Sequence, residues 1–334
     1  MSNHRSTPRV GPRLSYLAYA LASLVIISTA VGLAMYRPWI RPRQLIRVGV
    51  LKITPSLRYW IAEQKGIFEK HGLNVEIKDD YFSTNDIAND VAAGRIDVGH
   101  FATSTVFQAW SLSPEKMYIF TLDLNTPEDH IDALFVPSDS TVVRAEELRG
   151  KPIGKFPGEQ SAIVLTSYLE TQGLRPDEIV LFDVAPQNQI PTVMSGQVAA
   201  LYAYEPVGTL LVQDYQARRL VDGVTVQILN PFPGGAGLFS SKFLSARAQD
   251  APRFVEAMRE VTELAGDPAN NLEIRKILSE RLSIRFDVAA RTQWLVWRNA
   301  EEIDLANLQD YADFQLSHGQ LSVPIDVREL MYRE

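Results

Sequence analysis

The sequence predicts an α/β protein built of two similar halves and preceded by one apolar N-terminal segment. After residue 44, short runs of β-branched residues alternate with helical stretches, which is typical of a largely parallel sheet. The same order of elements then recurs later in the chain. The 334 residues are enough for two domains, and 46% hydrophobic and 22% charged residues indicate packed cores.

Residues 14–36 carry no charge and have the length of a membrane-spanning helix. As a helix they would extend about 34 Å, at about 1.5 Å per residue, enough to cross a bilayer core. This length, with Pro38 and Trp39 behind it, favours a retained transmembrane or signal-anchor helix over a cleaved signal peptide. Small residues at 28–34 leave cleavage open. Arginines flank the segment on both sides: Arg5, Arg9, Arg13, Arg37, Arg41 and Arg43.

Composition excludes several classes of protein. The chain has no Cys, so disulfides, thiol nucleophiles, iron–sulfur clusters and Cys-based zinc sites are ruled out. Six of the 33 basic residues and none of the 40 acidic ones lie before residue 45, so the remainder is strongly acidic. We therefore expect no nucleic-acid partner. The five His residues show no metal-ligand spacing, and we expect neither a metal nor a cofactor.

The first half begins with a clear strand, helix and strand. We expect strands at 46–51, 73–77, 97–99, 117–122 and 133–136, and helices at 55–64, 84–93 and 103–110. Thr54 and Pro55 open the first helix, and Gly94 ends the second.

The second half repeats this pattern. We expect strands at 152–154, 178–182 and 199–202, and helices at 161–172, at 189–195 and from about Glu205. Beyond Gly234 and Gly235 the periodicity is helical, and we expect helices at 252–265, 271–281, 287–299 and 305–317.

Four segments resemble those of a known family. They are 61–75 (IAEQKGIFEKHGLNV), 93–99 (AGRIDVG), 147–154 (ELRGKPIG) and 196–200 (GQVAA) followed by Glu205-Pro206. In this order and spacing, residues 46–240 resemble the periplasmic substrate-binding proteins of ABC importers for nitrate, sulfonates, taurine and thiamine-precursor pyrimidines. The chain departs from that family in having Ala199 where Asp is usual, and in lacking the Cys of the lipid-anchored members.

The resemblance implies a two-lobed periplasmic-binding-protein fold of type II, with a small-molecule ligand in the cleft between the lobes. Residues 45–137 and 234–334 would form lobe 1 and residues 138–233 lobe 2, with crossovers near Pro137 and Pro233. Residues 1–44 would be the tail and membrane anchor. The implied protein is not an enzyme. It lies on the periplasmic or extracellular face, anchored to the cytoplasmic membrane through residues 14–36, and its partners are the permease and ATPase subunits of an ABC transporter.

The candidate ligand-binding residues follow the carboxyl ends of predicted strands, where helix N-termini offer unpaired N–H groups. Each Ser or Thr there can equally be a plain helix cap, and Glu205 a residue of the hinge or the helix start. Tyr204 can stack on a planar ligand or pack in the core. The candidates are Thr54, Ser56, His100, Thr103, Ser104, Asp123, Gln160, Ser161, Tyr204 and Glu205.

The charges near these loops bear on the ligand class. The proposed loops hold Asp123, Glu159, Glu205 and the ring of Tyr204, with the bases Lys52, Arg58 and Lys155 nearby. This balance favours a neutral or cationic heterocycle over a sulfonate or nitrate. Two other functions stay open: a membrane-anchored ligand sensor or scaffold, and an enzyme similar to the pyrimidine-precursor synthases that share the fold. The Cys-rich iron motif of those synthases is absent here.

Overall fold

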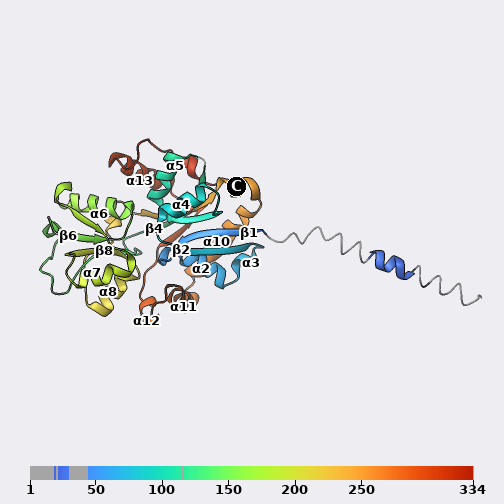
Figure 1. The fold of residues 1–334 in the computed structure, drawn as a ribbon, viewed down its shortest axis with the longest axis horizontal. Coiled ribbons are helices and arrows are strands. Elements are labelled where there is room, and N and C mark those ends of the chain that lie inside the picture. Colours follow the sequence, from blue (N-terminus) through green and yellow to red (C-terminus); the bar gives the residue numbers. More distant parts are fainter. Residues whose placement is uncertain (1–18, 20–21, 30–43, 115, 334) are drawn as a thin grey trace, which may run out of the picture. The chain divides into compact units, whose positions relative to one another are not determined.

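The computed structural model describes residues 19, 22–29, 44–114 and 116–333. The chain divides into two units, Met1–Gln44 and Leu45–Glu334. In the first, the described residues are Tyr19, the exposed helical residues 22–29 and Gln44 (Figure 1). The predicted anchor at 14–36 therefore lies mostly outside the described residues. Within the described residues, no helix has both the length and the apolar character needed to span a bilayer.

The second unit contains two mixed β-sheets. In the first sheet, β1 is parallel to β2 and β3, whereas β10 is antiparallel to β3 and β4, and β11 is antiparallel to β4. The strands, in sheet order, are β11 (Val296–Asn299), β4 (Met117–Asn125), β10 (Phe232–Ser240), β3 (Val98–Ala102), β1 (Leu45–Leu51) and β2 (Asn74–Tyr81).

The second sheet has the same mixture of directions. Strand β6 is parallel to β7 and β8, and β5 is antiparallel to β8 and β9. Figure 1 shows its elements together, mainly in green. In sheet order the strands are β7 (Val180–Asp183), β6 (Pro152–Lys155), β8 (Ala200–Tyr204), β5 (Asp132–Val136) and β9 (Arg218–Asp222).

The chain passes between the sheets twice, at residues 126–131 and 223–231. The first passage precedes the crossover expected near Pro137. Strand β5 already belongs to the second sheet, where it is completely buried between β8 and β9. The return lies just before the expected Pro233, which is already part of β10.

Helices cover both faces of the first sheet. On one face, Val48 of β1 packs in one hydrophobic cluster with Trp60 of α2 and Phe254 of α10. Figure 1 shows α10 and α11 close to α2. The other face packs against α4, α5 and α13. The helices are α2 (Leu57–Gln64), α3 (Ile67–Lys70), α4 (Thr84–Ala92), α5 (Thr103–Leu112), α6 (Glu159–Thr171), α7 (Gln189–Met194), α8 (Val207–Tyr215), α9 (Ser241–Arg247), α10 (Asp250–Gly266), α11 (Asn271–Leu282), α12 (Phe286–Ala289) and α13 (Leu305–Ser317).

Several elements differ from the sequence-based expectation. The helix expected at 287–299 is wrong: α12 ends at Ala289, and β11 then pairs with β4. Strands β9 and β10 are not predicted by the sequence analysis. Strand β10 contains Pro233 and three glycines, which are rare in strands. Tertiary contact explains a glycine at 237, since a Cβ atom there would lie 2.5 Å from Cγ2 of Thr121.

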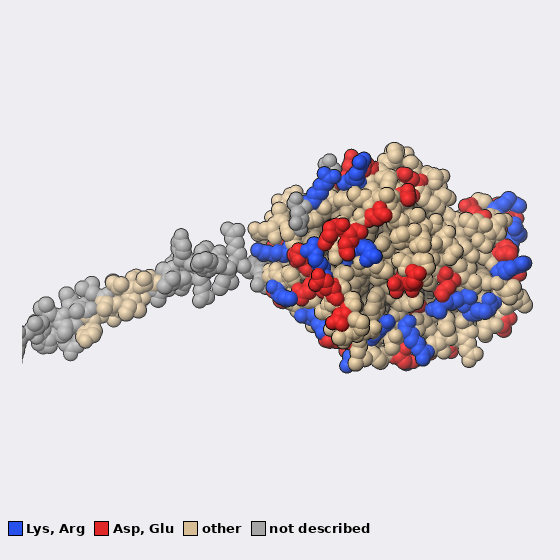
Figure 2. Space-filling view, turned by 180° about the vertical axis from the view of Figure 1, so that it is seen from behind, with Lys and Arg blue, Asp and Glu red and all other residues tan. Residues whose placement is uncertain are grey.

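Charged side chains are distributed over the surface without separation by sign. On the face of the described residues that Figure 2 shows, Lys and Arg side chains are interspersed with Asp and Glu, and no broad basic patch is visible. This face therefore offers no concentrated positive surface for a polyanion.

Candidate functional site

A cavity lies between the two sheets and takes its walls from both. The first sheet and its loops contribute Ser56, His100 and Asn125, and the second contributes residues 156–161 and Tyr204. About 90 Å³ is open to the centres of water-sized molecules, several times the room that one water needs. Both halves of the chain therefore shape one cavity.

The N-termini of three helices meet at this cavity. Its wall includes Ser56, Ala102 and Gly158, which are the residues immediately before α2, α5 and α6, and no side chain caps any of these helices. Uncapped N–H groups and the positive ends of helix dipoles stabilise anions. The three helices start there because each follows the carboxyl end of a strand.

Hydrogen bonds join the two sides of the cavity. Ser104 of α5 donates to Oε1 of Gln160 at 3.0 Å, and Nε2 of Gln160 donates to the carbonyl of Gly234 at 3.2 Å. The hydroxyl of Thr54 donates to the carbonyl of Glu205, also at 3.0 Å. These contacts belong to a closed arrangement of the two sheets.

A buried group of charges lies behind His100. Asp123 is completely buried, with Oδ1 3.1 Å from Nη1 of Arg58 and Oδ2 2.9 Å from Nε2 of His100. Arg58 is equally buried, and its guanidinium carbon lies 5.1 Å from the ring centre of Trp297. Asp123 therefore neutralises Arg58 inside the first sheet's core and does not line the cavity.

The structure divides the ten candidate residues evenly. Five of them line the cavity: Ser56, His100, Gln160, Ser161 and Tyr204. The others lie behind its walls: Thr54, Thr103, Ser104, Asp123 and Glu205. Glu205 is turned to its neighbours, because it accepts a 3.0 Å hydrogen bond from the backbone of Thr209 and lies 3.4 Å from Arg219. Burial raises the pKa of Glu205.

Several wall residues were not among the candidates. Asn125 lies at the end of β4, which is longer than expected, and Gly235 lies in the unexpected β10. Phe156 and Gly158 directly follow β6, so the rule that ligands bind beyond strand ends would have found them. Thr225 lies in the second passage between the sheets, and no sequence signal marks it.

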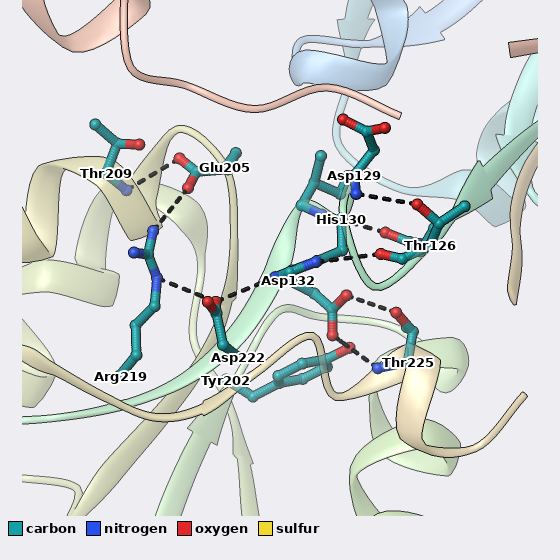
Figure 3. A network of polar contacts seen from close by, with 12 residues as sticks. Thr126, Asp129, His130, Asp132, Tyr202, Glu205, Thr209, Arg219, Asp222 and Thr225 are labelled. Atoms are coloured by element: carbon teal, nitrogen blue, oxygen red, sulfur yellow. Dashed lines mark hydrogen bonds and ion pairs between the residues drawn. The ribbon is translucent and has the colours of Figure 1, made fainter. Parts of the chain in front are cut away.

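A polar network joins the two passages between the sheets (Figure 3). Asp132 at the start of β5 accepts hydrogen bonds from the hydroxyl of Tyr202 at 3.0 Å, and from the backbone and hydroxyl of Thr225 at 3.0 and 2.6 Å. Nearby, Nε2 of His130 lies 3.1 Å from Oδ1 of Asp222. The second sheet is thus joined to both connecting segments by hydrogen bonds and an ion pair. In the part of the chain that is described, no group of three His, Cys, Asp or Glu residues is placed to hold a metal ion.

Two mixed sheets, two connecting passages and a cavity between them define the class of periplasmic-binding-protein folds. The chain belongs to the NMT1-like family, whose model matches residues 41–279. Among solved structures, the alkanesulfonate-binding protein SsuA from Xanthomonas axonopodis, bound to MOPS, is similar with a TM-score of 0.72 and 18% identity over 87% of this chain and 98% of that one. The desulfurization enzyme DszB is similar with a TM-score of 0.65 and 17% identity, over 87% of this chain and 97% of that one.

Curated relatives are distant. A protein of Brucella abortus described as a binding protein is 25% identical over 206 residues, and the match covers 59% of this chain and 57% of that relative. The chain therefore matches little more than half the length of the Brucella relatives. A protein of Bacillus subtilis described as binding aliphatic sulfonates is 23% identical over 297 residues, which cover 86% of this chain and 85% of that protein.

Proposed function

We propose that this protein is the extracytoplasmic solute-binding receptor of an ABC importer. It captures a small molecule between its two sheets and delivers it to a permease that is driven by ATPase subunits. The observation that carries the proposal is the cavity itself, because its walls come from both sheets and hydrogen bonds of Thr54, Ser104 and Gln160 cross between them. A ligand that favours this closed arrangement shifts the balance between open and closed forms, and a partner can read that state.

The proposed ligand is a small oxyanion of the sulfonate type. Asp123 is paired with Arg58, and Glu205 with Thr209 and Arg219, so of the three carboxylates near the predicted loops only Glu159 lies in the described cavity wall. Besides Glu159, whose carboxylate accepts a hydrogen bond from Gln108, the wall offers donors: three helix N-termini without side-chain caps, His100 and the amide of Asn125. The family and its sulfonate-binding members point to the same class.

The same fold also serves a desulfurization enzyme, so fold alone does not separate receptor from enzyme. The receptor is supported by the cross-sheet contacts, whereas the chain has no Cys to act as a nucleophile. We further propose that residues 14–36 hold the receptor at the outer face of the cytoplasmic membrane, on the strength of their length and lack of charge.

Thermal unfolding of the full-length protein, freed of bound ligand by unfolding and refolding, tests the proposal. The panel is ethanesulfonate, taurine, nitrate, bicarbonate, a thiamine-precursor pyrimidine, riboflavin and a polyamine. A ligand at a hundred times its Kd adds about 2.7 kcal/mol to the stability, so a saturable shift with the sulfonates is expected. A shift with the pyrimidine or polyamine alone would contradict the ligand class, and no shift with any compound would contradict the receptor.

A further inference from the structure

None of the described residues in the cavity wall carries a permanent positive charge. Among the wall residues described, His100 is the single basic one and Glu159 the single acidic one. The two nearest buried bases are already occupied. Arg58 pairs with Asp123, and Lys155 contacts Asp183 and donates to the carbonyl of Gly158 at 3.1 Å. An anion in this cavity therefore has one side chain from which it can draw a full positive charge.

The position of Asp123 decides which nitrogen of His100 faces the ligand. Nε2 lies 2.9 Å from Oδ2 of Asp123 and is sealed from solvent. The two atoms do not form a hydrogen bond of good geometry, but a ring nitrogen and a carboxylate oxygen this close repel each other unless Nε2 carries a hydrogen, because two lone pairs would otherwise face each other. The ring is only 4% exposed and forms part of the cavity wall, so Nδ1 is the nitrogen left for a ligand.

We propose that His100 supplies the positive charge of this site, so that the anion and one proton bind together. In the bound state both ring nitrogens carry hydrogens: Nε2 directs its hydrogen to Asp123, and Nδ1 donates to an oxygen of the ligand. This inference rests on the proposed function and adds to it the residue that selects an anion. It also explains how a site without Lys or Arg in its wall holds a charged ligand.

Because of the surrounding charges, binding of the anion and binding of the proton depend on each other. The groups that face His100 are Asp123 of β4, Arg58 and Tyr59 of α2, and across the cavity Glu159 of α6 and Tyr204 of β8. Arg58 and Asp123 neutralise each other, so a proton on His100 places one positive charge on the first sheet's side of the cavity, with the carboxylate of Glu159 in the opposite wall. The ligand's negative charge compensates it, and by linkage the anion favours protonation and protonation favours the anion.

The consequence is an affinity that falls as the pH rises. If only the protonated ring binds the anion, Kd rises with pH, by at most tenfold for each pH unit. A site made only of helix N-termini, in contrast, would show no such dependence, because backbone N–H groups do not titrate.

Isothermal titration calorimetry of ethanesulfonate with the full-length protein tests this at several values between pH 5.5 and 8.5. Each pH is measured in amine buffers that differ in ionisation enthalpy, so that the number of protons taken up is obtained directly. We expect Kd to rise at least tenfold across the range and proton uptake to lie between zero and one. Flat affinity with no proton uptake in the wild type would overturn the inference while leaving the receptor in place.

The variant His100→Gln keeps a side-chain N–H group but cannot be charged. We expect it to lose the pH dependence and the proton uptake, and to bind at least tenfold more weakly than the wild type at pH 6. His71→Gln is the matched control. His71 is not part of the cavity wall, and its Nε2 lies 2.8 Å from Oε2 of Glu260. This variant should keep the wild-type pH profile. A His100→Gln protein with the wild-type pH profile would also overturn the inference. If the wild-type protein does not bind ethanesulfonate at any pH, the proposed ligand class is contradicted instead.

Discussion

Ser104 of α5 donates a 3.0 Å hydrogen bond to Oε1 of Gln160 of α6, and so joins a helix of the first sheet to a helix of the second. The amide of Gln160 continues the link by donating to Gly234 in β10. One side chain thus forms hydrogen bonds with two elements on the opposite side of the cavity. These bonds are present only when the two sheets are close, so Gln160 stabilises the closed form relative to the open one.

Gln160→Ala should therefore weaken ligand binding with little change in folding stability. Two hydrogen bonds at about 0.5–1.5 kcal/mol each correspond to a loss of roughly tenfold or more in affinity for ethanesulfonate. Calorimetry measures the loss, and Gln172→Ala, at the exposed end of the same helix, serves as control. Equal affinities for the two variants would show that the cross-sheet bonds do not contribute to the bound state.

Asp123→Ala should destabilise the fold strongly. The substitution leaves the guanidinium of Arg58 buried without its carboxylate, and breaking a buried ion pair in this way costs about 3–5 kcal/mol. Urea denaturation gives the free energy of unfolding. Asp177→Ala, which removes an exposed partner of Arg175, should have no measurable effect. If both variants unfold at the same urea concentration, Asp123 does not compensate Arg58.

Asp132 should make the folding stability depend on pH in a defined direction. Burial raises the pKa of this carboxyl above its usual 3.8, although Thr225 and Tyr202 donate hydrogen bonds to it. The folded state therefore binds the proton more tightly than the unfolded state. The resulting stabilisation is complete below about pH 3.8 and is lost as the pH rises through the folded pKa.

The variant Asp132→Asn removes this titration, so its stability relative to the wild type should increase from pH 3.5 to 6.5 in urea denaturation. Asp90→Asn provides the opposite sign, because the hydrogen bond from Tyr81, followed by that of Arg95, lowers the pKa of Asp90. Its stability relative to the wild type should decrease over the same range. A constant difference between Asp132→Asn and the wild type would refute the assignment.

Gly237→Ala should destabilise the protein through the first sheet. A Cβ atom at 237 would lie 2.5 Å from Cγ2 of Thr121 and 2.6 Å from the hydroxyl of Tyr59, and Tyr59 is completely buried. Overpacking of this kind costs about 1–3 kcal/mol. Gly266→Ala, where no atom lies within 4 Å of the added carbon, should leave the melting temperature nearly unchanged. Similar melting temperatures for both variants would argue against close packing at Gly237.

The sequence predicted the parts of the candidate site that depend on local order. Ser56, Gln160 and Ser161 lie in the cavity wall as expected, because each begins a helix that follows a parallel strand, and the carboxyl ends of parallel strands meet at one edge of a sheet. Asn125 and Gly235 were missed because β4 is longer than its apolar pattern suggests and β10 is rich in glycine.

By itself, the sequence determined the α/β class, most helices and strands of the two halves, and the family. Periodicity and turn residues report the surroundings of each short segment, and these are local properties. The tertiary structure alone decided which polar side chains face the cavity. Asp123 turns to Arg58, 65 positions away in the chain, and Thr54 to Glu205, 151 positions away. A buried charge or hydroxyl points to whichever distant group satisfies it, because leaving it unpaired costs more than any local preference supplies.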